Sequence, residues 1–230
     1  MEVEPGVNML LDPEDFVSRY ILSTGQWEAE SWAICKQHLP VGGTFVDVGA
    51  HIGYYSLKAA RVVGSKGHVI AVEPDPDTVR QLRDNIQASG ANVIAVQPVA
   101  CSDSEGELDL FASPRANTGQ TSLSRANAQQ SGGVSTVYHV RSRPLDAIIQ
   151  ESGVSRVDVM KIDVEGAELL VLRGARQTLA RYGPTLIVEV IDRQLQSMGA
   201  SAAELKEFLR SQGYTPRHSI DADKNIEFAK

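Results

Sequence analysis

The most informative stretch of the sequence is FVDVGAHIG (residues 45–53), a short apolar run that leads into a glycine turn and then into a helical segment. Glycines in the first strand-to-helix turn of a doubly wound sheet let the backbone approach a nucleotide at the carboxyl ends of the strands. A dinucleotide fingerprint needs glycine at positions 49, 51 and 54, but His51 and Tyr54 occupy two of these positions. An acid at Asp47, two residues before Gly49, favours a ligand with a cationic amine over a diphosphate.

Apolar runs on both sides of this stretch alternate with helical segments, which is typical of βαβ units and a mostly parallel sheet. The runs span residues 44–48, 68–72, 92–99, 157–162 and 185–191, and each is apolar enough for a strand buried on both faces. Helices are expected at 54–63, 76–89 and 166–181, and from a capping box at Ser201 to Gly213. Residues 214–219 and 225–229 are expected to pair antiparallel. We therefore predict an α/β fold: a doubly wound, Rossmann-like, seven-stranded and mostly parallel sheet with a terminal antiparallel hairpin and helices on both faces.

Two segments depart from this alternation. Residues 1–42 predict an N-terminal helical extension or lid, with helices from a cap at Asp12 to about residue 22 and from about residue 27 to 38, before a main domain at 43–230. Residues 107–143 predict an insertion of two half-exposed strands around a flap at 112–133 that is rich in Ser, Asn, Gln and Gly. The insertion carries Arg115, Arg125, Arg141 and Arg143. It is either a solvated loop or a cap that attracts an anionic substrate.

The composition limits the class of protein. The 230 residues carry a net charge of −7, with 42% hydrophobic and 22% charged residues, which excludes collagen, a disordered tail and a disulfide scaffold. The acidic balance argues against binding to nucleic acid or to an anionic membrane. The N-terminus has acids where a signal peptide has bases, and no apolar run is long enough to span a membrane. We expect a cytoplasmic protein without nucleic-acid or membrane partners; the oligomeric state stays open.

Glu73 ends the second strand, 20 residues after Gly53. A carboxylate at this point of a doubly wound sheet can accept hydrogen bonds from both hydroxyl groups of a ribose. Together with the turn after Asp47, Glu73 therefore predicts a nucleoside-containing ligand.

Charged residues also interrupt the fourth and fifth strands. Lys161 and Asp163 share one face by period-two alternation, and a lysine in a buried strand requires a carboxylate partner. The pair is either structural, with Glu189 or Asp158 as the partner of Lys161, or Asp163 acts on a substrate. Asp163 and Glu189 could hold Mg²⁺, form an acid/base pair or clamp Lys161. His51, beside the glycine turn, is a further candidate base.

Three stretches resemble the FkbM family of S-adenosylmethionine (SAM)-dependent methyltransferases: VDVGAHIGYYSL (46–57), AVEPDP (71–76) and especially MKIDVEGAELLVLRGA (160–175). The resemblance covers about residues 40–192, and TGQWE at 24–28 also looks like the family's N-terminal segment. His51 replaces the second glycine of the general methyltransferase turn, as is usual in this family.

The resemblance implies a set of SAM contacts at the strand ends. They are Asp47, Gly49, Ala50, His51, Gly53, Glu73, Pro74, Ser102, Asp103 and Asp163. Among them, Asp47 and the turn would face the methionine part, Glu73 the ribose and Asp103 the amino group of adenine. The resemblance also implies O-methylation of a hydroxyl on a sugar, a macrolide or another small secondary metabolite. If the four arginines of the insertion cap the site, they would favour an anionic acceptor.

The catalytic candidates form one group. They are Asp163, Lys161, Glu189 and His51. An alcohol is a poor nucleophile while it is protonated, so a base is needed, and Asp163 beside the transferable methyl is placed to accept the proton. N-methylation of an amine or a protein side chain, and a module that binds SAM without turnover, are the alternatives.

Overall fold

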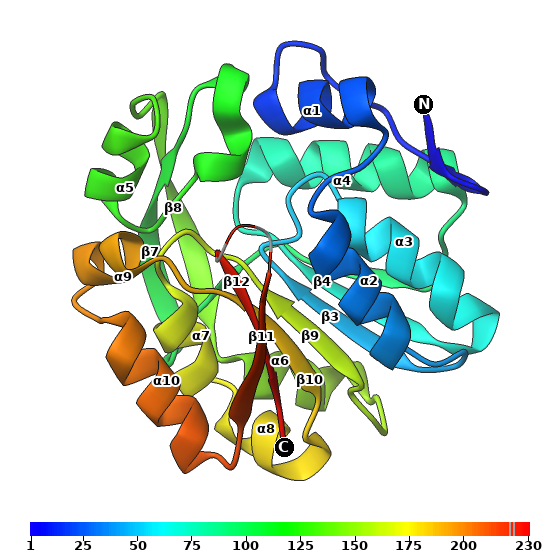
Figure 1. Cartoon of the computed structure of the whole chain (residues 1–230). Helices are drawn as coiled ribbons and strands as arrows, with labels where there is room; N and C mark the ends of the chain where they lie inside the picture. Colours follow the sequence, from blue (N-terminus) through cyan, green and yellow to red (C-terminus); the bar gives the residue numbers. More distant parts are fainter. Residues whose placement is uncertain (221, 223) are drawn as a thin grey trace.

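The computed structural model describes residues 1–220, 222 and 224–230, and a seven-stranded sheet lies at its centre (Figure 1). The strand order is β11-β12-β10-β9-β3-β4-β5. Five of these strands are parallel: β5 (Ile94–Gln97), β4 (His68–Val72), β3 (Thr44–Val48), β9 (Val159–Ile162) and β10 (Thr185–Glu189). The hairpin of β11 (Thr215–Ile220) and β12 (Asn225–Ala229) joins antiparallel to β10. The predicted fold class is confirmed.

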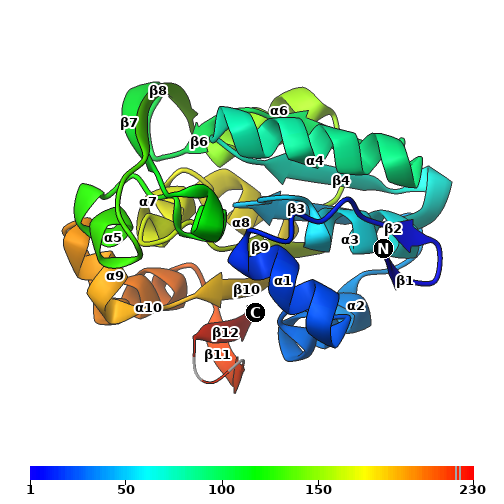
Figure 2. The same ribbon diagram turned by 90° about the horizontal axis from the view of Figure 1, so that it is seen from above.

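Helices cover both faces of the sheet, which is why its central strands are buried on both sides. The helices on one face are α2 (Ala29–His38), α3 (Tyr54–Val63) and α4 (Pro76–Ser89), and those on the other are α6 (Leu145–Ser152), α7 (Glu168–Arg173), α8 (Arg176–Tyr182) and α10 (Ala202–Ser211). Figure 2 shows α2 and α3 on one side of the sheet and α7, α8 and α10 on the other. Phe45 packs toward the first layer and Val46 toward the second, as strand alternation requires.

The first helix starts later than predicted. α1 spans Phe16–Thr24, and its N-cap is Asp15 rather than Asp12, because Asp15 Oδ2 accepts the backbone N–H of Ser18 at 2.8 Å. Asp12 instead closes a preceding turn, where Oδ1 accepts the N–H of Glu14 at 3.0 Å.

The helix predicted at 166–181 is two helices, α7 and α8, and this prediction is wrong in two places. Glu165 and Gly166 have φ values of 55° and 108°, so the chain turns before α7 begins. Gly174 separates the helices and packs against a loop: a Cβ there would lie 2.1 Å from the carbonyl oxygen of Ser102. The strands predicted at 92–99, 157–162 and 185–191 are each shorter at one or both ends, and α9 (Asp192–Ser197) was not predicted.

The two strands of the predicted insertion, β7 (Gly106–Ala112) and β8 (Thr136–Arg143), form a separate three-stranded sheet with β6 (Ala100–Cys101), which precedes the insertion. β7 and β8 pair antiparallel, as expected. The flap between them contains a 3₁₀ helix, η2 (Arg115–Gln120), and α5 (Arg125–Gln130). Figure 1 shows the flap, in green, next to α1, in dark blue, and η2 contacts α1 directly.

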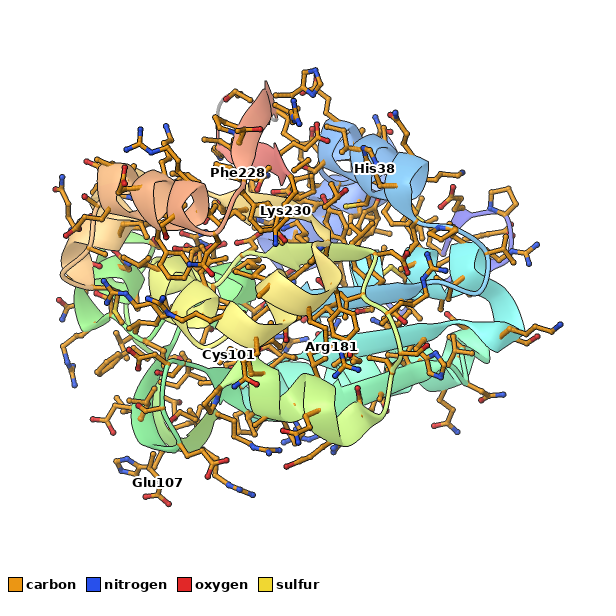
Figure 3. The ribbon with its side chains drawn as sticks, turned by 90° about the horizontal axis from the view of Figure 1, so that it is seen from below. His38, Cys101, Glu107, Arg181, Phe228 and Lys230 are labelled. Atoms are coloured by element: carbon orange, nitrogen blue, oxygen red, sulfur yellow. The ribbon has the colours of Figure 1, made fainter. Side chains whose placement is uncertain are left out.

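The chain ends lie at opposite parts of the fold. At the N-terminus, β1 (Glu2–Glu4) pairs with β2 (Val7–Asn8). Elsewhere in the chain, a short 3₁₀ helix, η1 (Gly64–Lys66), follows α3. At the C-terminus, Phe228 is buried, and Lys230 Nζ donates to the carbonyl of Leu179 at 2.7 Å (Figure 3). Within the described residues, each helix is too short or too polar to cross a lipid bilayer.

Candidate active site

A cavity of about 320 Å³ opens at the carboxyl ends of β3, β4, β9 and β10, and its size is in the range of small-molecule sites. We call the side formed by strand ends the sheet wall; it includes Gly49, His51, Glu73, Lys161, Asp163 and Glu189. We call the opposite side, contributed by the N-terminal segment and the flap, the outer wall; it includes Phe16, Trp27, Glu28, Thr118 and Gln120. Residues from both segments that were candidate lids, 24–28 and 112–133, therefore line the cavity.

The turn after β3 brings its backbone directly against the loop after β9. Gly49 has a φ of 85°, and a Cβ there would lie 1.8 Å from the carbonyl oxygen of Asp163, so only glycine fits. Gly49 and Ala50 both donate their N–H groups to the carbonyl of Val72, at 2.9 and 3.0 Å. Gly49, Ala50 and His51 line the cavity as expected.

Four residues of the predicted cofactor set are not among the lining residues: Gly53, Asp47, Ser102 and Asp103. Gly53 lies at the start of α3, with a φ of 92° and Leu82 packed where its Cβ would be. Asp47 is buried behind the turn and accepts a hydrogen bond from Ser56 Oγ at 2.6 Å. Burial raises the pKa of Asp47 to about 6. Asp47 thus supports the turn from behind.

Glu73 and Pro74 line the cavity at the end of β4. The Glu73 carboxyl group is held by two backbone donors: Oε2 accepts from the N–H of His51 and Oε1 from that of Asp75, both at 2.9 Å. Burial raises its pKa to about 7, even though both hydrogen bonds favour the charged form. The side chain is therefore fixed in one orientation with acceptor capacity left for a ligand.

Ser102 and Asp103 are not among the residues that line the cavity, whose wall on this side is made by Val99, Ala100 and Cys101. Asp103 Oδ1 accepts from the hydroxyl groups of Ser102 and Ser104, at 3.4 and 3.3 Å. The structure thus places the pair one residue beyond the wall.

Lys161 forms ion pairs across the cavity. Its Nζ lies 2.5 Å from Asp163 Oδ2 and 3.3 Å from Glu28 Oε2, and 4.7 Å from the centre of the Tyr55 ring. Burial alone would lower the pKa of Lys161, but the two carboxylates together raise it well above its ordinary value. Within the described residues, the ion-pair partners of Lys161 are not Glu189 or Asp158, the two that the sequence suggested.

Glu28 was not predicted as a site residue. It precedes α2 with a φ of 42°, and Tyr55 donates its hydroxyl to Glu28 Oε2 at 2.9 Å. A glutamate with a positive φ leaves no pattern in a sequence. The signal that pointed to Glu28 was the resemblance of residues 24–28 to the family's N-terminal segment.

Three carboxyl groups meet beside Lys161. One oxygen each from Asp163, Glu165 and Glu189 lies within 4.8 Å of the others. Glu165 accepts hydrogen bonds from the side-chain amides of Gln120, at 2.7 Å, and Gln194. In the part of the chain that the structure describes, Glu189 Oε2 is buried without a hydrogen-bond partner.

The charge of this acidic group is reduced by its surroundings. Burial, followed by repulsion from Asp163, raises the pKa values of both Glu165 and Glu189 well above their ordinary value. Burial thus opposes the charged forms of Glu165 and Glu189, and the ammonium of Lys161 balances Asp163.

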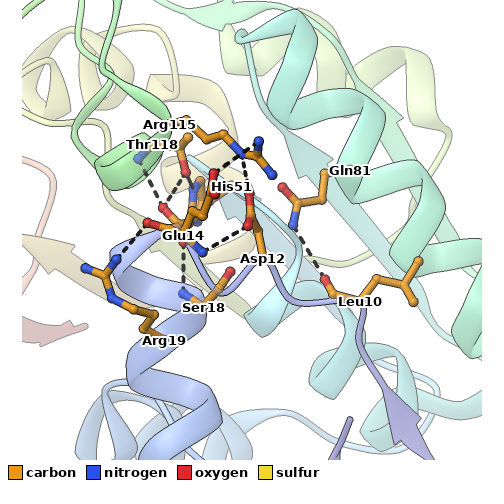
Figure 4. Close-up of polar contacts among 10 residues, drawn as sticks. Leu10, Asp12, Glu14, Ser18, Arg19, His51, Gln81, Arg115 and Thr118 are labelled. Carbon is orange, nitrogen blue, oxygen red and sulfur yellow. Dashed lines mark hydrogen bonds and ion pairs between the residues drawn. The ribbon is translucent and has the colours of Figure 1, made fainter.

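His51 connects the sheet wall to the outer wall. Its Nε2 lies 2.8 Å from Thr118 Oγ1 in the flap, and Thr118 Oγ1 donates to Asp15 Oδ1 at 2.8 Å (Figure 4). Burial lowers the pKa of His51 more than the neighbouring carboxylates raise it. The imidazole is therefore neutral at pH 7.

The aromatic part of the outer wall lies at the start of α1 and α2. Trp27 packs edge-on against Phe16 and Tyr20, with ring centroids 6.2 and 5.3 Å apart. The backbone N–H of Trp27 donates to Tyr54 Oη at 3.0 Å. Phe16 and Trp27 thus give this side of the cavity an apolar surface.

The four arginines of the insertion lie outside the cavity wall. Arg115 Nε pairs with Asp12 at 2.7 Å, and Arg143 pairs with Glu151. The Arg125 guanidinium lies 4.6 Å from the centre of the Phe111 ring. Three of the four guanidinium groups therefore contact other residues of the protein.

Comparison with known proteins places these features in a family. The family profile described as "Methyltransferase FkbM domain" matches residues 47–216. The chain is 32% identical over 144 residues to the hexuronic acid methyltransferase AglP of Haloferax volcanii, covering 63% of this chain and 54% of AglP. It is 28% identical over 125 residues to the 2-O-methyltransferase NoeI of Sinorhizobium fredii, covering 50% of this chain and 51% of NoeI. The chain thus matches only about half the length of these relatives.

The fold is also that of a solved structure. A crystal structure of an FkbM methyltransferase from Methylobacillus flagellatus superposes with a TM-score of 0.56 at 21% identity, covering 82% of this chain and 43% of that one.

Proposed function

The chain belongs to the FkbM family of SAM-dependent methyltransferases, and from this premise we propose that it transfers a methyl group from SAM to a hydroxyl of a sugar, a macrolide or another small secondary metabolite. Residues 43–230 would form the methyltransferase domain and residues 1–42 an extension that covers its cavity. The observation that carries the proposal is the convergence of the Gly49 turn, Glu73, Asp163 and His51 on one cavity. The name of AglP supports a sugar-type acceptor, and that of NoeI supports transfer to oxygen.

SAM would lie along the sheet wall. Glu73 has its orientation fixed by two backbone N–H groups and would accept the ribose hydroxyls, while the turn at Gly49 would lie against the methionine part. The amine of SAM donates hydrogen bonds, so it would lie at the end where the carboxyl oxygens of Asp163 and Glu189 can accept them. Adenine would lie beyond Cys101, toward the loop of Ser102 and Asp103.

Methyl transfer from a sulfonium is an in-line displacement in which positive charge disperses. The protein contributes alignment, exclusion of water and removal of the hydroxyl proton. Asp163 and His51 both line the cavity and would be the groups that accept this proton. Lys161 holds the Asp163 carboxylate in place, and Glu189 adds a carboxyl group beside it.

Mg²⁺ bound to Asp163 and Glu189 is the alternative for this end of the cavity. The contacts favour a reaction without it, because the ammonium of Lys161 already lies 2.5 Å from Asp163 and two amides hold Glu165. Activity should therefore persist in EDTA; loss of activity in EDTA and recovery with Mg²⁺ would instead assign the carboxylates to a metal.

Calorimetry with SAM, S-adenosylhomocysteine and NAD tests the cofactor. SAM and S-adenosylhomocysteine should bind and NAD should not, since His51 and Tyr54 stand where a pyrophosphate requires glycine. Binding of NAD alone would defeat the proposal.

Incubation with methyl-labelled SAM and a panel of acceptors then tests the reaction. We expect label in sugars or other polyols. Label only in amines or in protein side chains would favour the N-methyltransferase alternative, and binding of SAM with no transfer to any acceptor would favour a binding module.

A further inference from the structure

A chain of hydrogen bonds links His51 to the flap and to the start of α1, and Figure 4 shows its members His51 and Thr118. His51 Nε2 lies 2.8 Å from Thr118 Oγ1, which lies 2.8 Å from Asp15 Oδ1. Asp15 also accepts the N–H groups of Thr118, at 3.1 Å, and Ser18, at 2.8 Å. The three linked side chains come from the turn after β3, the flap and the start of α1.

The protons of this chain can be counted. Asp15 is buried and receives three donors, so it acts as a carboxylate that only accepts. Thr118 has one hydroxyl proton, which it donates to Asp15, so it can only accept from His51. The proton of the neutral imidazole is therefore on Nε2. Nδ1 carries a lone pair and has no hydrogen-bond partner among the described residues.

We propose that Asp15 and Thr118 are positioning residues that hold His51 in the Nε2–H tautomer, so that its free Nδ1 accepts the proton of the acceptor hydroxyl. The inference rests on the proposed function and assigns the base within it. The hydroxyl proton moves to Nδ1 while the oxygen bonds to the methyl carbon. The C–S bond breaks with its electron pair on sulfur, which yields the methyl ether, S-adenosylhomocysteine and an imidazolium that later releases the proton to water.

The charges around His51 suit this role. The carboxylates that face it are Asp15 at the start of α1, Asp163 after β9 and Asp75 at the start of α4. Their attraction is outweighed by burial, so the pKa of His51 is lowered and the ring is free to accept a proton at neutral pH. The imidazolium would donate from Nε2 to Thr118, whose hydroxyl already points to the Asp15 carboxylate.

The arrangement couples the base to closure of the cavity. Thr118 belongs to the flap and Asp15 to the N-terminal segment, so the chain of bonds exists only when both lie against His51. A base that is oriented by the same contacts that cover the cavity acts only where water is excluded.

The test uses the full chain with ¹⁵N-labelled histidine in the presence of S-adenosylhomocysteine, so that no acceptor needs to be known. NMR distinguishes the protonated from the unprotonated ring nitrogen, and the His51 signals are assigned by their loss in His51→Asn among the five histidines. We expect the Nε2–H tautomer to predominate. In Thr118→Val, which keeps the branched shape but loses the hydroxyl, we expect a mixture of tautomers and a titration midpoint lower by about 0.5 to 1 pH unit.

Three further variants separate positioning from structure. Asp15→Asn keeps a good helix cap but removes the charge, and its midpoint should also fall; Thr118→Ser should restore the original tautomer and midpoint. Arg115→Gln is the matched control, because it removes another contact between flap and N-terminal segment, the ion pair to Asp12, without touching His51. Its tautomer and midpoint should not change.

A His51 signal with the proton on Nδ1, or a tautomer and midpoint unchanged in both Thr118→Val and Asp15→Asn, would overturn the inference. A shift of equal size in Arg115→Gln would do the same, because it would attribute the effect to loosening of the flap. Failure of the proposed function has a separate readout, the absence of SAM binding in calorimetry of the unaltered protein.

Discussion

The two walls of the cavity are built in different ways. The sheet wall consists of residues at the ends of paired strands, and backbone register fixes their positions: Asp47 of β3 lies opposite Lys161 of β9, which lies opposite Ile187 of β10. The outer wall is held by side-chain contacts between segments that are far apart in the sequence, such as Asp15 and Thr118. Substitutions in the sheet wall should therefore disrupt the fold and the cofactor site. Substitutions in the outer wall should instead change the orientation of His51 and the access of solvent to the cavity.

Lys161→Met should have the largest effect, because Lys161 joins the two walls. It would leave the carboxylates of Asp163 and Glu28 without their shared cation in a buried site, at a cost of about 3–5 kcal/mol of unfolding free energy. Lys36→Met is the control: its pair with Glu4 is more than half exposed on the lysine side and should contribute at most about 1 kcal/mol. Urea denaturation measures both, and equal losses would contradict the buried role of Lys161.

A pair of glycine substitutions compares the walls directly. Gly49→Ala should cost about 2–4 kcal/mol and abolish SAM binding, because its φ is 85° and its Cβ would overlap the carbonyl of Asp163. Gly25→Ala, after α1, has a similar φ of 79° but open space around the Cβ, so only the backbone strain of about 1 kcal/mol remains. Thermal unfolding and calorimetry with SAM would reveal the difference. Retained SAM binding in Gly49→Ala would show that the turn can move away from the loop after β9.

The sheet wall should also make the ligand-free protein sensitive to pH. The pKa of Glu73 is raised to about 7, from about 4.5 in the unfolded chain, so its contribution to stability is present below about pH 4.5 and is lost as the pH rises through 7. In urea denaturation, the free energy of unfolding that is lost between pH 5 and 8 should be smaller in Glu73→Gln by about 1–3 kcal/mol. An unchanged slope would mean that Glu73 titrates normally.

The same variant tests the cofactor contact. Glu73→Gln replaces a charged acceptor by a neutral one and should weaken SAM binding at pH 8 by about tenfold or somewhat more. Asp77→Asn is the control. Asp77 is exposed on α4, pairs with Arg80 and lies outside the cavity wall, so the variant should bind SAM normally.

Arg115→Gln should have the smallest effect. Arg115 is exposed and pairs with Asp12 and Glu14 between the flap and the N-terminal segment, so its loss should change stability by less than about 1 kcal/mol. The Asp15–Thr118 contact does not involve Arg115, so we expect the outer wall to stay closed and proteolysis near residues 112–133 to be unchanged. A large loss of stability would show that the outer wall supports the whole fold.

The difference between the walls also explains what the sequence could predict. The strands and the turn at Gly49 were predictable because buried parallel strands need continuous apolar runs and the glycine positions have steric causes. Thr118 was not, because it lies in a polar stretch whose composition predicts only a loop. The choice of Asp15 over Asp12 as helix cap depends on tertiary contacts: Asp12 binds Arg115, and Asp15 binds Thr118.

The contact between Asp15 and Thr118 joins residues that are 103 positions apart in the chain. Such a contact forms late in folding, because the entropy of closing a long loop is offset only after the intervening strands have paired. It is also among the first to open, since it depends on a few side-chain bonds rather than on paired strands. In hydrogen exchange, the amide of Thr118 should therefore exchange much faster than that of Asp163, which donates to Val48 within the sheet. The nucleotide half of the site is thus completed with the core, and the half that orients His51 is assembled afterwards.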